Sequence, residues 1–276
     1  MLTGIVSNCW RLQLEGGAKL EELVAEAARQ GFQAIELRQG CLGEFEDRES
    51  QIPRPAALAE LARRFPELRF NLALAWPFFD SEWPLDDPLL SAGLAAAQAL
   101  APLPGATHLR LVDVSTDDGA AARDNLELLA SRIASIARQL FDGGGKLSLE
   151  NGRQPWTRMV HLMALTREHA QATGAEICLC YDPANVPDIA QPAVARQVLA
   201  DVSRLSLGMV HFKQLRAGEM QAEVNAGDID WKVQIQTLSR LGYAGPACLE
   251  IRASQEIWRH LLASRKYIDA LEKAGD

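Results

Sequence analysis

The sequence alternates short β-type runs with longer amphipathic helical stretches along its whole length, and this alternation is the strongest constraint on its fold. Eight runs are strand candidates: Gly4–Cys9, Ala34–Arg38, Arg69–Ala75, His108–Val112, Lys146–Glu150, Ile177–Tyr181, Met209–Phe212 and Ala247–Ile251. A helical stretch follows each of them: Ala18–Gln30, Ala56–Phe65, Leu89–Leu100, Ala120–Phe141, Pro155–Ala172, Ala193–Leu205, Trp231–Leu241 and Gln255–Leu271. Eight strand–helix units in 276 residues, without a long linker, predict a single (β/α)8 TIM barrel domain over residues 1–276.

Residues that begin and end helices stand where this assignment needs them. Gly31 and Gly242 follow predicted helices and suit C-caps. Pro155 suits a first helical turn, and Asp230 can cap the helix that follows it. An open, doubly wound sheet is the alternative α/β arrangement, but no glycine-rich GxGxxG turn follows the first strand to support it.

The overall charge and the cysteines restrict the partners and the compartment. The net charge is −8 and the pI is about 5.3, so we expect no attraction to nucleic acid or to an anionic membrane surface. The N-terminal segment MLTGIVSNCW lacks the basic and apolar regions of a signal peptide, and no apolar stretch is long enough to span a bilayer. Five cysteines without a CxxC pair indicate buried thiols in a reducing, cytoplasmic compartment.

Four polar residues stand at or next to the ends of the last four predicted strands. They are Glu150 in KLSLEN, Asp182 in ICLCYDPAN, His211 in GMVHFKQ and Glu250 in PACLEIR. They follow one another at intervals of roughly 30 to 40 residues, which is about one strand–helix unit each. Because a parallel barrel builds its active site at the carboxyl ends of its strands, we expect these four side chains to meet.

Side-chain parity supports an inward orientation of these residues. Residues i and i+2 of a strand share a face, so the small residues Ser148, Cys180 and Cys248 lie beneath the three carboxylates. The opposite face carries the large apolar residues Leu147, Leu149, Ile177, Leu179, Val210, Phe212, Leu249 and Ile251. This division predicts that the polar groups face the barrel axis and the large apolar groups face the helices.

Three carboxylates and one imidazole suit one divalent metal ion, Mn²⁺ or Mg²⁺ first, with Co²⁺ or Zn²⁺ as alternatives. Such an ion keeps positions for the oxygens of a sugar hydroxyl and an adjacent carbonyl, and it makes the neighbouring C–H more acidic. Glu150 and Glu250 could then exchange protons with that carbon through an enediolate. Salt bridges at a barrel mouth are the alternative role, but four converging ligands, with one of only five histidines among them, favour a metal.

Several motifs resemble the xylose isomerase-like TIM barrel superfamily, the sugar phosphate isomerase/epimerase group. These motifs are ENG (Glu150–Gly152), DPAN (Asp182–Asn185), HFKQ (His211–Gln214), GDIDW (Gly227–Trp231), GYAGPACLEI (Gly242–Ile251) and GFQAIELR (Gly31–Arg38). In ketose 3-epimerases a Glu, Asp, His, Glu set after strands five to eight binds the metal, and the two glutamates are the acid/base pair. The resemblance implies these roles for Glu150, Asp182, His211 and Glu250, and it implies a small carbohydrate-like substrate.

The chain departs from the ketose 3-epimerases at two positions. Those enzymes carry a histidine three residues after the metal-binding Asp, where this chain has Asn185, and an arginine six residues after the His, where it has Ala217. An inosose-type dehydratase is therefore kept beside the isomerase or epimerase, and a sugar-binding barrel without turnover is the non-enzymatic alternative. Endonuclease IV-type activity is not expected, because the third strand carries Asn71 and Ala73 in place of the histidines of a trinuclear zinc site.

Aromatic and amide side chains are candidates for contacts to the substrate. Trp10 and Trp76 stand in the loops after the first and third predicted strands, where an apolar wall beside a sugar would lie. Asn185 follows the presumed metal ligand Asp182 and is a further candidate. Barrels of this kind often pair, so a homodimer is left open.

Charged residues near the four ligands allow two interpretations. Lys213 shares parity with His211, and Arg252 with Glu250, so both should reach the mouth of the barrel. They could grip a substrate carboxylate or phosphate, or they could pair with the metal-site carboxylates, and the second role is favoured for Arg252. Glu36 and Arg110 also point inward, and we predict a buried structural ion pair between them.

Overall fold

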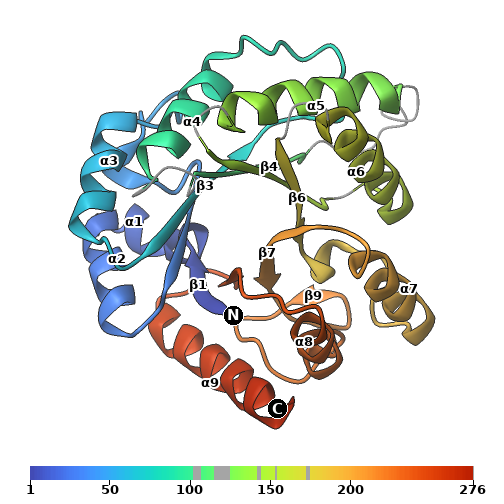
Figure 1. Cartoon of the computed structure of the whole chain (residues 1–276). Coiled ribbons are helices and arrows are strands. Elements are labelled where there is room, and N and C mark those ends of the chain that lie inside the picture. The colour runs from blue at the N-terminus through green and yellow to red at the C-terminus, as the bar shows by residue number, and fades with distance from the viewer. Residues whose placement is uncertain (102–106, 115–124, 142–143, 153, 172–174, 276) are drawn as a thin grey trace.

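A computed structural model of the protein shows eight parallel strands closed into a barrel and surrounded by helices (Figure 1). The structure describes residues 1–101, 107–114, 125–141, 144–152, 154–171 and 175–275. Neighbouring strands follow the order β1-β10-β7-β6-β5-β4-β3-β2. The predicted (β/α)8 barrel is thereby confirmed, and the open doubly wound sheet is excluded.

The barrel strands run parallel and stand close to their predicted positions. They are β1 Leu2–Val6, β2 Ala34–Arg38, β3 Arg69–Ala75, β4 His108–Val112, β5 Lys146–Glu150, β6 Glu176–Tyr181, β7 Leu207–Phe212 and β10 Pro246–Leu249. A two-stranded antiparallel hairpin, β8 Leu215–Arg216 with β9 Glu219–Met220, was not predicted. β1 ends at Val6 rather than Cys9, because a 3-10 helix over Ser7–Trp10 opens the loop that follows it.

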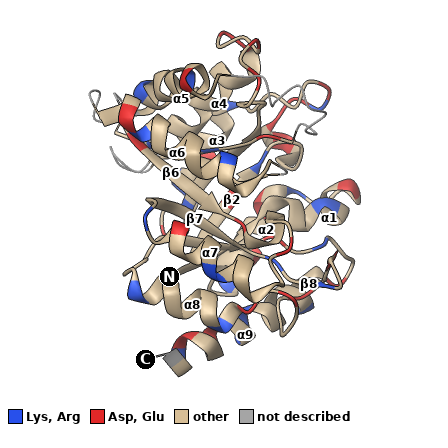
Figure 2. Ribbon diagram, turned by 90° about the vertical axis from the view of Figure 1, so that its right-hand side faces the viewer, with Lys and Arg blue, Asp and Glu red and all other residues tan. Residues whose placement is uncertain are grey.

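Helices enclose the barrel on the outside. They are α1 Arg11–Glu15, α2 Leu20–Arg29, α3 Pro55–Arg64, α4 Pro88–Ala99, α5 Leu126–Phe141, α6 Trp156–Gln171, α7 Pro192–Val202, α8 Trp231–Arg240 and α9 Ile257–Gly275. The predicted helix starts at 120–124 and end at 172 lie outside the described residues. Figure 2 shows Lys and Arg interspersed with Asp and Glu along the outer helices. Among the described helices, none combines the length and the hydropathy that crossing a membrane requires.

The predicted helix ends are confirmed where the backbone tests them. Gly31 and Gly242 adopt the positive φ angles of +80° and +67° that suit a C-cap glycine. The Asp230 carboxylate accepts a hydrogen bond from the Val233 N–H at 3.2 Å and so caps α8. Pro155 directly precedes α6, and its carbonyl accepts the N–H of Arg158.

The parity prediction is also confirmed. The large apolar residues of the predicted outer face belong to the main core between barrel and helices. A separate small cluster fills the barrel interior: Val6, Ala34, Cys180, Met209 and Cys248. The interior is tight, since a Cβ added to Gly208 would lie only 2.1 Å from Ser148 Oγ. Small side chains therefore make room for the polar groups above them.

We predict that Gly4→Ala destabilises the barrel. A Cβ at Gly4 would lie 2.6 Å from the Ala34 carbonyl oxygen and 2.7 Å from Cys248 Sγ, so the backbone of two strands has to shift. Overpacking of this kind costs about 3 kcal/mol of unfolding free energy, which urea denaturation measures. The control is Gly242→Ala, where an added Cβ meets nothing within 4 Å and only the positive φ costs about 1 kcal/mol. Equal losses in the two variants would contradict this account.

Candidate active site

The ends of β5, β6, β7 and β10 bring four predicted side chains to one point. These strands are neighbours in the barrel order, and Glu150, Asp182, His211 and Glu250 stand at or just after their carboxyl ends. One ligand atom from each residue lies within 4.8 Å of the others, and all four residues are buried. The four strand-end groups therefore form one compact polar cluster at the mouth of the barrel.

The His211 ring lies at the centre of this cluster. Its Nδ1 is 3.2 Å from Glu150 Oε1, 3.0 Å from Glu250 Oε2 and 3.9 Å from Asp182 Oδ2. Its Nε2 faces Glu36, at 3.3 Å from Oε1. Without a bound cation, burial opposes a charged ring, but the surrounding carboxylates raise the pKa of His211 well above its usual range. With a cation among the other three carboxylates, the proton would stay on Nε2 beside Glu36, and Nδ1 would face the cation. This is the arrangement in which a carboxylate orients a metal-binding histidine.

Arg110 of β4 links Glu150 of the cluster to Glu36 of β2. Its side chain is fully buried and forms ion pairs with Glu36 and with Glu150, where Nη1 lies 2.5 Å from Oε2. The predicted Glu36–Arg110 pair is confirmed. The contact with Glu150 was not predicted, and it makes the pair part of the site rather than a separate structural feature.

Lys213 binds two of the cluster carboxylates. Its Nζ lies 2.5 Å from Asp182 Oδ2 and 2.8 Å from Glu250 Oε2. Both contacts join buried groups of opposite charge and are therefore ion pairs. Of the two roles considered for Lys213, the structure thus shows pairing with the carboxylates.

The charges of the described side chains in the cluster do not cancel. Four buried carboxylates, Glu36, Glu150, Asp182 and Glu250, face two permanent cations, Arg110 and Lys213. Two negative charges remain beside a neutral His211 ring, as it would be with a metal bound, and one remains beside a protonated ring. Buried charge is costly unless it is compensated. The converging carboxylate oxygens, the imidazole nitrogen among them and this residual charge all fit a divalent cation.

Burial and neighbouring charges shift the pKa values of these carboxyl groups in different directions. Burial alone would raise the pKa of Glu150, but the charges of Arg110 and His211 lower it. Burial also opposes ionisation of Glu250, yet Lys213 and His211 hold its pKa well below the usual range. Burial raises the pKa of Asp182 to about 6, despite the charge of Lys213. The two glutamates are thus the more strongly ionised members of the set.

The other predicted site residues differ in their burial and in their contacts. Asn185 Nδ2 is 3.3 Å from Glu150 Oε1 and donates to the Asn151 carbonyl at 2.9 Å. Trp10 and Trp76 are buried, and their indole N–H groups have no hydrogen-bond partner among the described residues. Arg252 is exposed, and no ion pair joins it to the four ligands in the described part of the chain.

Asn8 is a site residue that was not predicted. Its Nδ2 donates to Glu250 Oε1 at 2.6 Å, across the closure between β1 and β10. Asn8 was assigned to the interior of the first strand, and an earlier strand end would have placed it in the loop above the barrel. The polar side chain of Asn8 in this run was the signal that could have indicated an earlier end of the strand.

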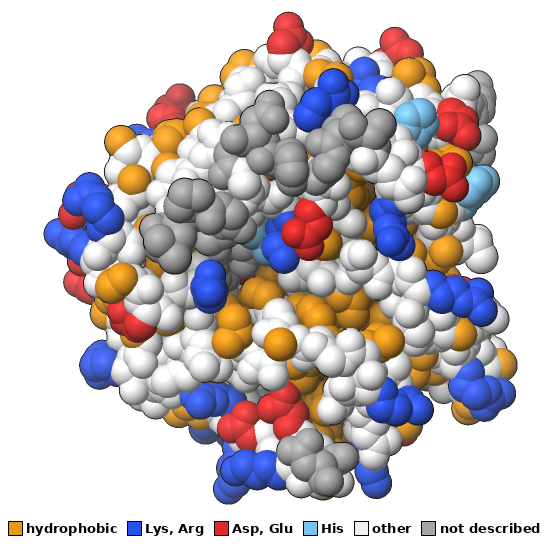
Figure 3. Space-filling model, in the orientation of Figure 1, with side chains coloured by type: hydrophobic (Ala, Val, Ile, Leu, Met, Phe, Trp, Pro, Cys, Tyr) orange, Lys and Arg blue, Asp and Glu red, His pale blue; other side chains and the backbone are white. Residues whose placement is uncertain are grey.

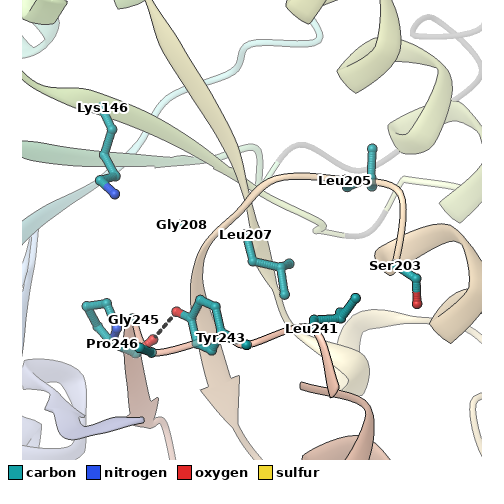
Figure 4. A pocket seen from close by; sticks show the side chains of 11 residues that line it. Lys146, Ser203, Leu205, Leu207, Gly208, Leu241, Tyr243, Gly245 and Pro246 are labelled. Carbon is teal, nitrogen blue, oxygen red and sulfur yellow. Dashed lines mark hydrogen bonds between the residues drawn. The ribbon is translucent and has the colours of Figure 1, made fainter. Parts of the chain in front are cut away.

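One cavity lies at the other end of the barrel. It has a volume of about 470 Å³ and is lined by the first residues of β5, β7 and β10, namely Lys146, Leu207 and Pro246 (Figure 4). Figure 3 shows the apolar side chains that gather in this hollow. Its lining carries no carboxylate or histidine, so the polar cluster at the opposite end is the better candidate for chemistry.

Comparison with protein families agrees with this architecture. A family model described as the xylose isomerase-like TIM barrel matches residues 24–271. The chain belongs to this family. No curated protein sequence matches the chain significantly.

Solved structures share the fold of this xylose isomerase-like barrel at low sequence identity. L-ribulose 3-epimerase is 16% identical with a TM-score of 0.64, covering 99% of this chain and 95% of that one. An IOLI protein with a bound zinc atom is 14% identical with a TM-score of 0.66, covering 100% and 99%. A xylose isomerase-like TIM barrel protein from Mycobacterium smegmatis in complex with magnesium is 17% identical with a TM-score of 0.62, covering 93% and 89%. At these identities the similarity establishes the fold alone.

We predict that Arg110→Met strongly destabilises the metal-free xylose isomerase-like barrel. The substitution leaves Glu36 and Glu150 buried without their shared cation, which costs about 3–5 kcal/mol of unfolding free energy. Denaturant unfolding in EDTA measures the loss, so that metal binding does not contribute. Adding Glu36→Gln should recover part of it, because one unpaired charge is removed.

The matched control for Arg110 is Arg63→Met. Arg63 pairs with Glu60 at the surface of α3, where an exposed ion pair contributes less than about 1 kcal/mol. A loss for Arg110→Met no larger than that of the control would show that the buried network does not hold the site together.

Proposed function

We propose that the protein is a divalent-metal-dependent isomerase or epimerase that acts on a sugar or a small hydroxy-carbonyl compound through an enediolate. The convergence of Glu150, Asp182, His211 and Glu250 within 4.8 Å carries this proposal. Family membership supports it, as does the similarity in fold to L-ribulose 3-epimerase and to the zinc- and magnesium-bound barrels. Fold alone does not assign an activity, so the proposal depends on the chemistry of the four side chains.

The donor set indicates which ion the site would take. Three carboxylates favour Mn²⁺ or Mg²⁺, while the imidazole keeps Co²⁺ and Zn²⁺ as alternatives. The residual charge of the cluster favours a divalent ion over a monovalent one. When bound, such a cation supplies Lewis-acid polarisation of the hydroxy-carbonyl group. Cys180 Sγ lies 3.6 Å from His211 Nε2 but is not proposed as a ligand, because burial raises the pKa of this thiol to about 12.

The two glutamates would move the protons. One carboxylate, ionised, would remove the proton from the carbon beside the carbonyl, and the other, having taken up a proton before this step, would deliver it to the opposite face, which inverts that carbon. Return of the proton to the neighbouring carbon gives isomerisation instead. Arg110 orients Glu150, while Lys213 and Asn8 orient Glu250. The reacting oxygens are thereby held in place before substrate arrives.

Three further side chains are proposed to contact the substrate. The buried indole N–H groups of Trp10 and Trp76 lack partners among the described residues, and a sugar hydroxyl could accept from them. Asn185 contacts Glu150, and its amide is proposed to reach the same substrate. Arg252, exposed at the rim, is proposed to act only on the approach of a charged substrate. The five buried, unpaired cysteines support a reducing, cytoplasmic setting.

An inosose-type dehydratase is the second candidate, because the same enolate could expel a β-hydroxyl. NMR in D₂O separates the two reactions. Deuterium incorporation without loss of water favours isomerisation or epimerisation, whereas loss of the hydroxyl identifies the dehydratase.

We predict that each chain binds one Mn²⁺ ion and is stabilised by it. An ion at 100 times its dissociation constant adds about 2.7 kcal/mol to the unfolding free energy, so the melting temperature should rise with Mn²⁺ and fall with EDTA. Asp182→Ala removes a ligand and should weaken binding at least tenfold by calorimetry. Asp230→Ala, which alters only the cap of α8, should bind Mn²⁺ normally. Absence of Mn²⁺, Mg²⁺, Co²⁺ and Zn²⁺ binding in the parent protein would refute the metal site.

We predict that Glu150→Gln and Glu250→Gln each lower proton exchange by about 10²- to 10⁴-fold, the usual contribution of a general acid or base. Deuterium incorporation from D₂O, followed by NMR over a panel of ketoses and ketoacids, measures the effect. Glu176→Gln, at an exposed residue paired with Lys146, is the control. Turnover retained in both variants with Mn²⁺ bound would eliminate the two-glutamate mechanism.

A further inference from the structure

A second polar site lies beside the cluster, on the segment that joins β5 to α6. Gln154 follows Glu150 by four residues and is 3% exposed, yet neither its amide oxygen nor its amide nitrogen has a hydrogen-bond partner in the described structure. Burying an amide without partners costs several kilocalories per mole in an apolar medium, so such a group is a candidate for ligand binding.

Arg158 shows the same feature with a full charge. It lies in the first turn of α6, and its Nε and Nη2 atoms are buried without a hydrogen-bond partner among the described residues. These two nitrogens form one edge of the guanidinium, with two parallel N–H bonds that match the two oxygens of a carboxylate or phosphate. The ion pairs of the described residues do not include Arg158, so none of the described carboxylates neutralises its charge.

The Arg158 guanidinium is held in place by the residues around it. It lies over the Phe79 ring at 5.3 Å from the centroid, a cation–π contact that provides no hydrogen-bond acceptor for Nε and Nη2. Phe79 is itself buried, and its backbone N–H donates to Asp113 Oδ2 at 2.7 Å. The backbone of Asp113 in turn packs closely against Gly152. A Cβ added to Gly152 would lie 2.6 Å from the backbone carbonyl oxygen of Asp113.

These contacts place the site at the same end of the barrel as the polar cluster. Gly152 is two residues from Glu150, and four residues of extended chain span at most about 14 Å, which limits the distance from Glu150 to Gln154. The described cations that contact the cluster, Arg110 and Lys213, are already bound to its carboxylates. Arg158 is therefore the better placed cation for an anionic part of a ligand.

The geometry points to a subsite for a terminal oxyanion: Arg158 and Gln154 bind the carboxylate or phosphate of an acidic sugar whose hydroxy-carbonyl end lies at the four-residue cluster. The location of the hydroxy-carbonyl end rests on the proposed function, whereas anion binding by Arg158 does not. Arg158 supplies two N–H donors and the charge, and the Gln154 amide donates to a further oxygen of the anion or of the adjacent hydroxyl.

Three hexoses that differ only at carbon six test this inference: D-glucose, D-glucuronate and D-glucose 6-phosphate. Calorimetry on the whole protein, with Mn²⁺ and again in EDTA, should show that at least one acidic sugar binds ten times more tightly than glucose. The acid that binds more tightly distinguishes a carboxylate site from a phosphate site. Equal affinity for all three sugars in the parent protein would overturn the proposal.

Substitutions of Arg158 and Gln154 test whether these residues cause the preference for acidic sugars. Arg158→Met should abolish the tenfold preference without changing the affinity for glucose, and Arg158→Lys, which keeps the charge but loses the fork, should restore only part of it. Gln154→Glu should weaken acidic sugars selectively by repulsion. Arg167→Met, at an exposed arginine of the same helix, should retain the full preference. A preference that survives in Arg158→Met would also refute the assignment.

The outcomes for this subsite and for the proposed reaction are separable. Selective binding of acidic sugars without deuterium exchange in any tested sugar would support the oxyanion subsite and count against the isomerase. Exchange in neutral ketoses, without preference for acidic sugars, would support the isomerase and reject the subsite.

Discussion

The buried ion pairs of Arg110 are the constraint on which the rest of this structure depends. One guanidinium neutralises Glu36 and Glu150 in the barrel interior, where water cannot solvate either carboxylate. Glu36 then faces one nitrogen of His211, so the other nitrogen faces Glu150, Asp182 and Glu250. The orientation of the proposed ligands thus depends on residues of β2 and of β4, the neighbour of β5, as well as on the strands that carry those ligands.

The packing beneath the cluster follows from the size of this network. A long arginine and a histidine can enter the barrel only if neighbouring positions are small, and the interior contains Gly4, Gly208, Ser148 and Cys248 at close contact. The outer face has the opposite requirement, because leucine and isoleucine side chains fill the space to the helices. The two faces of each strand therefore perform separate tasks: one stabilises the fold by apolar burial, and the other holds charge.

Most of the fold could be predicted from the sequence because strand spacing and side-chain parity are local properties. Each depends on residues within one segment. Together they were sufficient to predict that Glu150, Asp182, His211 and Glu250 meet at one end of the barrel. Two contacts were not predicted: that of Arg110 with Glu150 and that of Asn8 with Glu250. The first depends on the register between β4 and β5, and the second depends on the closure of the barrel between β1 and β10. Parity states that a side chain points inward, but it does not state which of several inward partners it reaches.

The same limit explains the assignment of the cations. Lys213 and Arg252 were candidates for a substrate anion because they share the parity of the cluster, yet Lys213 contacts its carboxylates and Arg252 lies in solvent. Inward-facing cations next to carboxylates are attracted to those carboxylates first, so a cation available to a ligand has to come from outside the strands. Arg158 meets this condition because it stands on a helix and stacks on an aromatic ring rather than on an acid. In a barrel with an acidic mouth, recognition of an acidic substrate is therefore expected to fall to the loops and first helical turns around it.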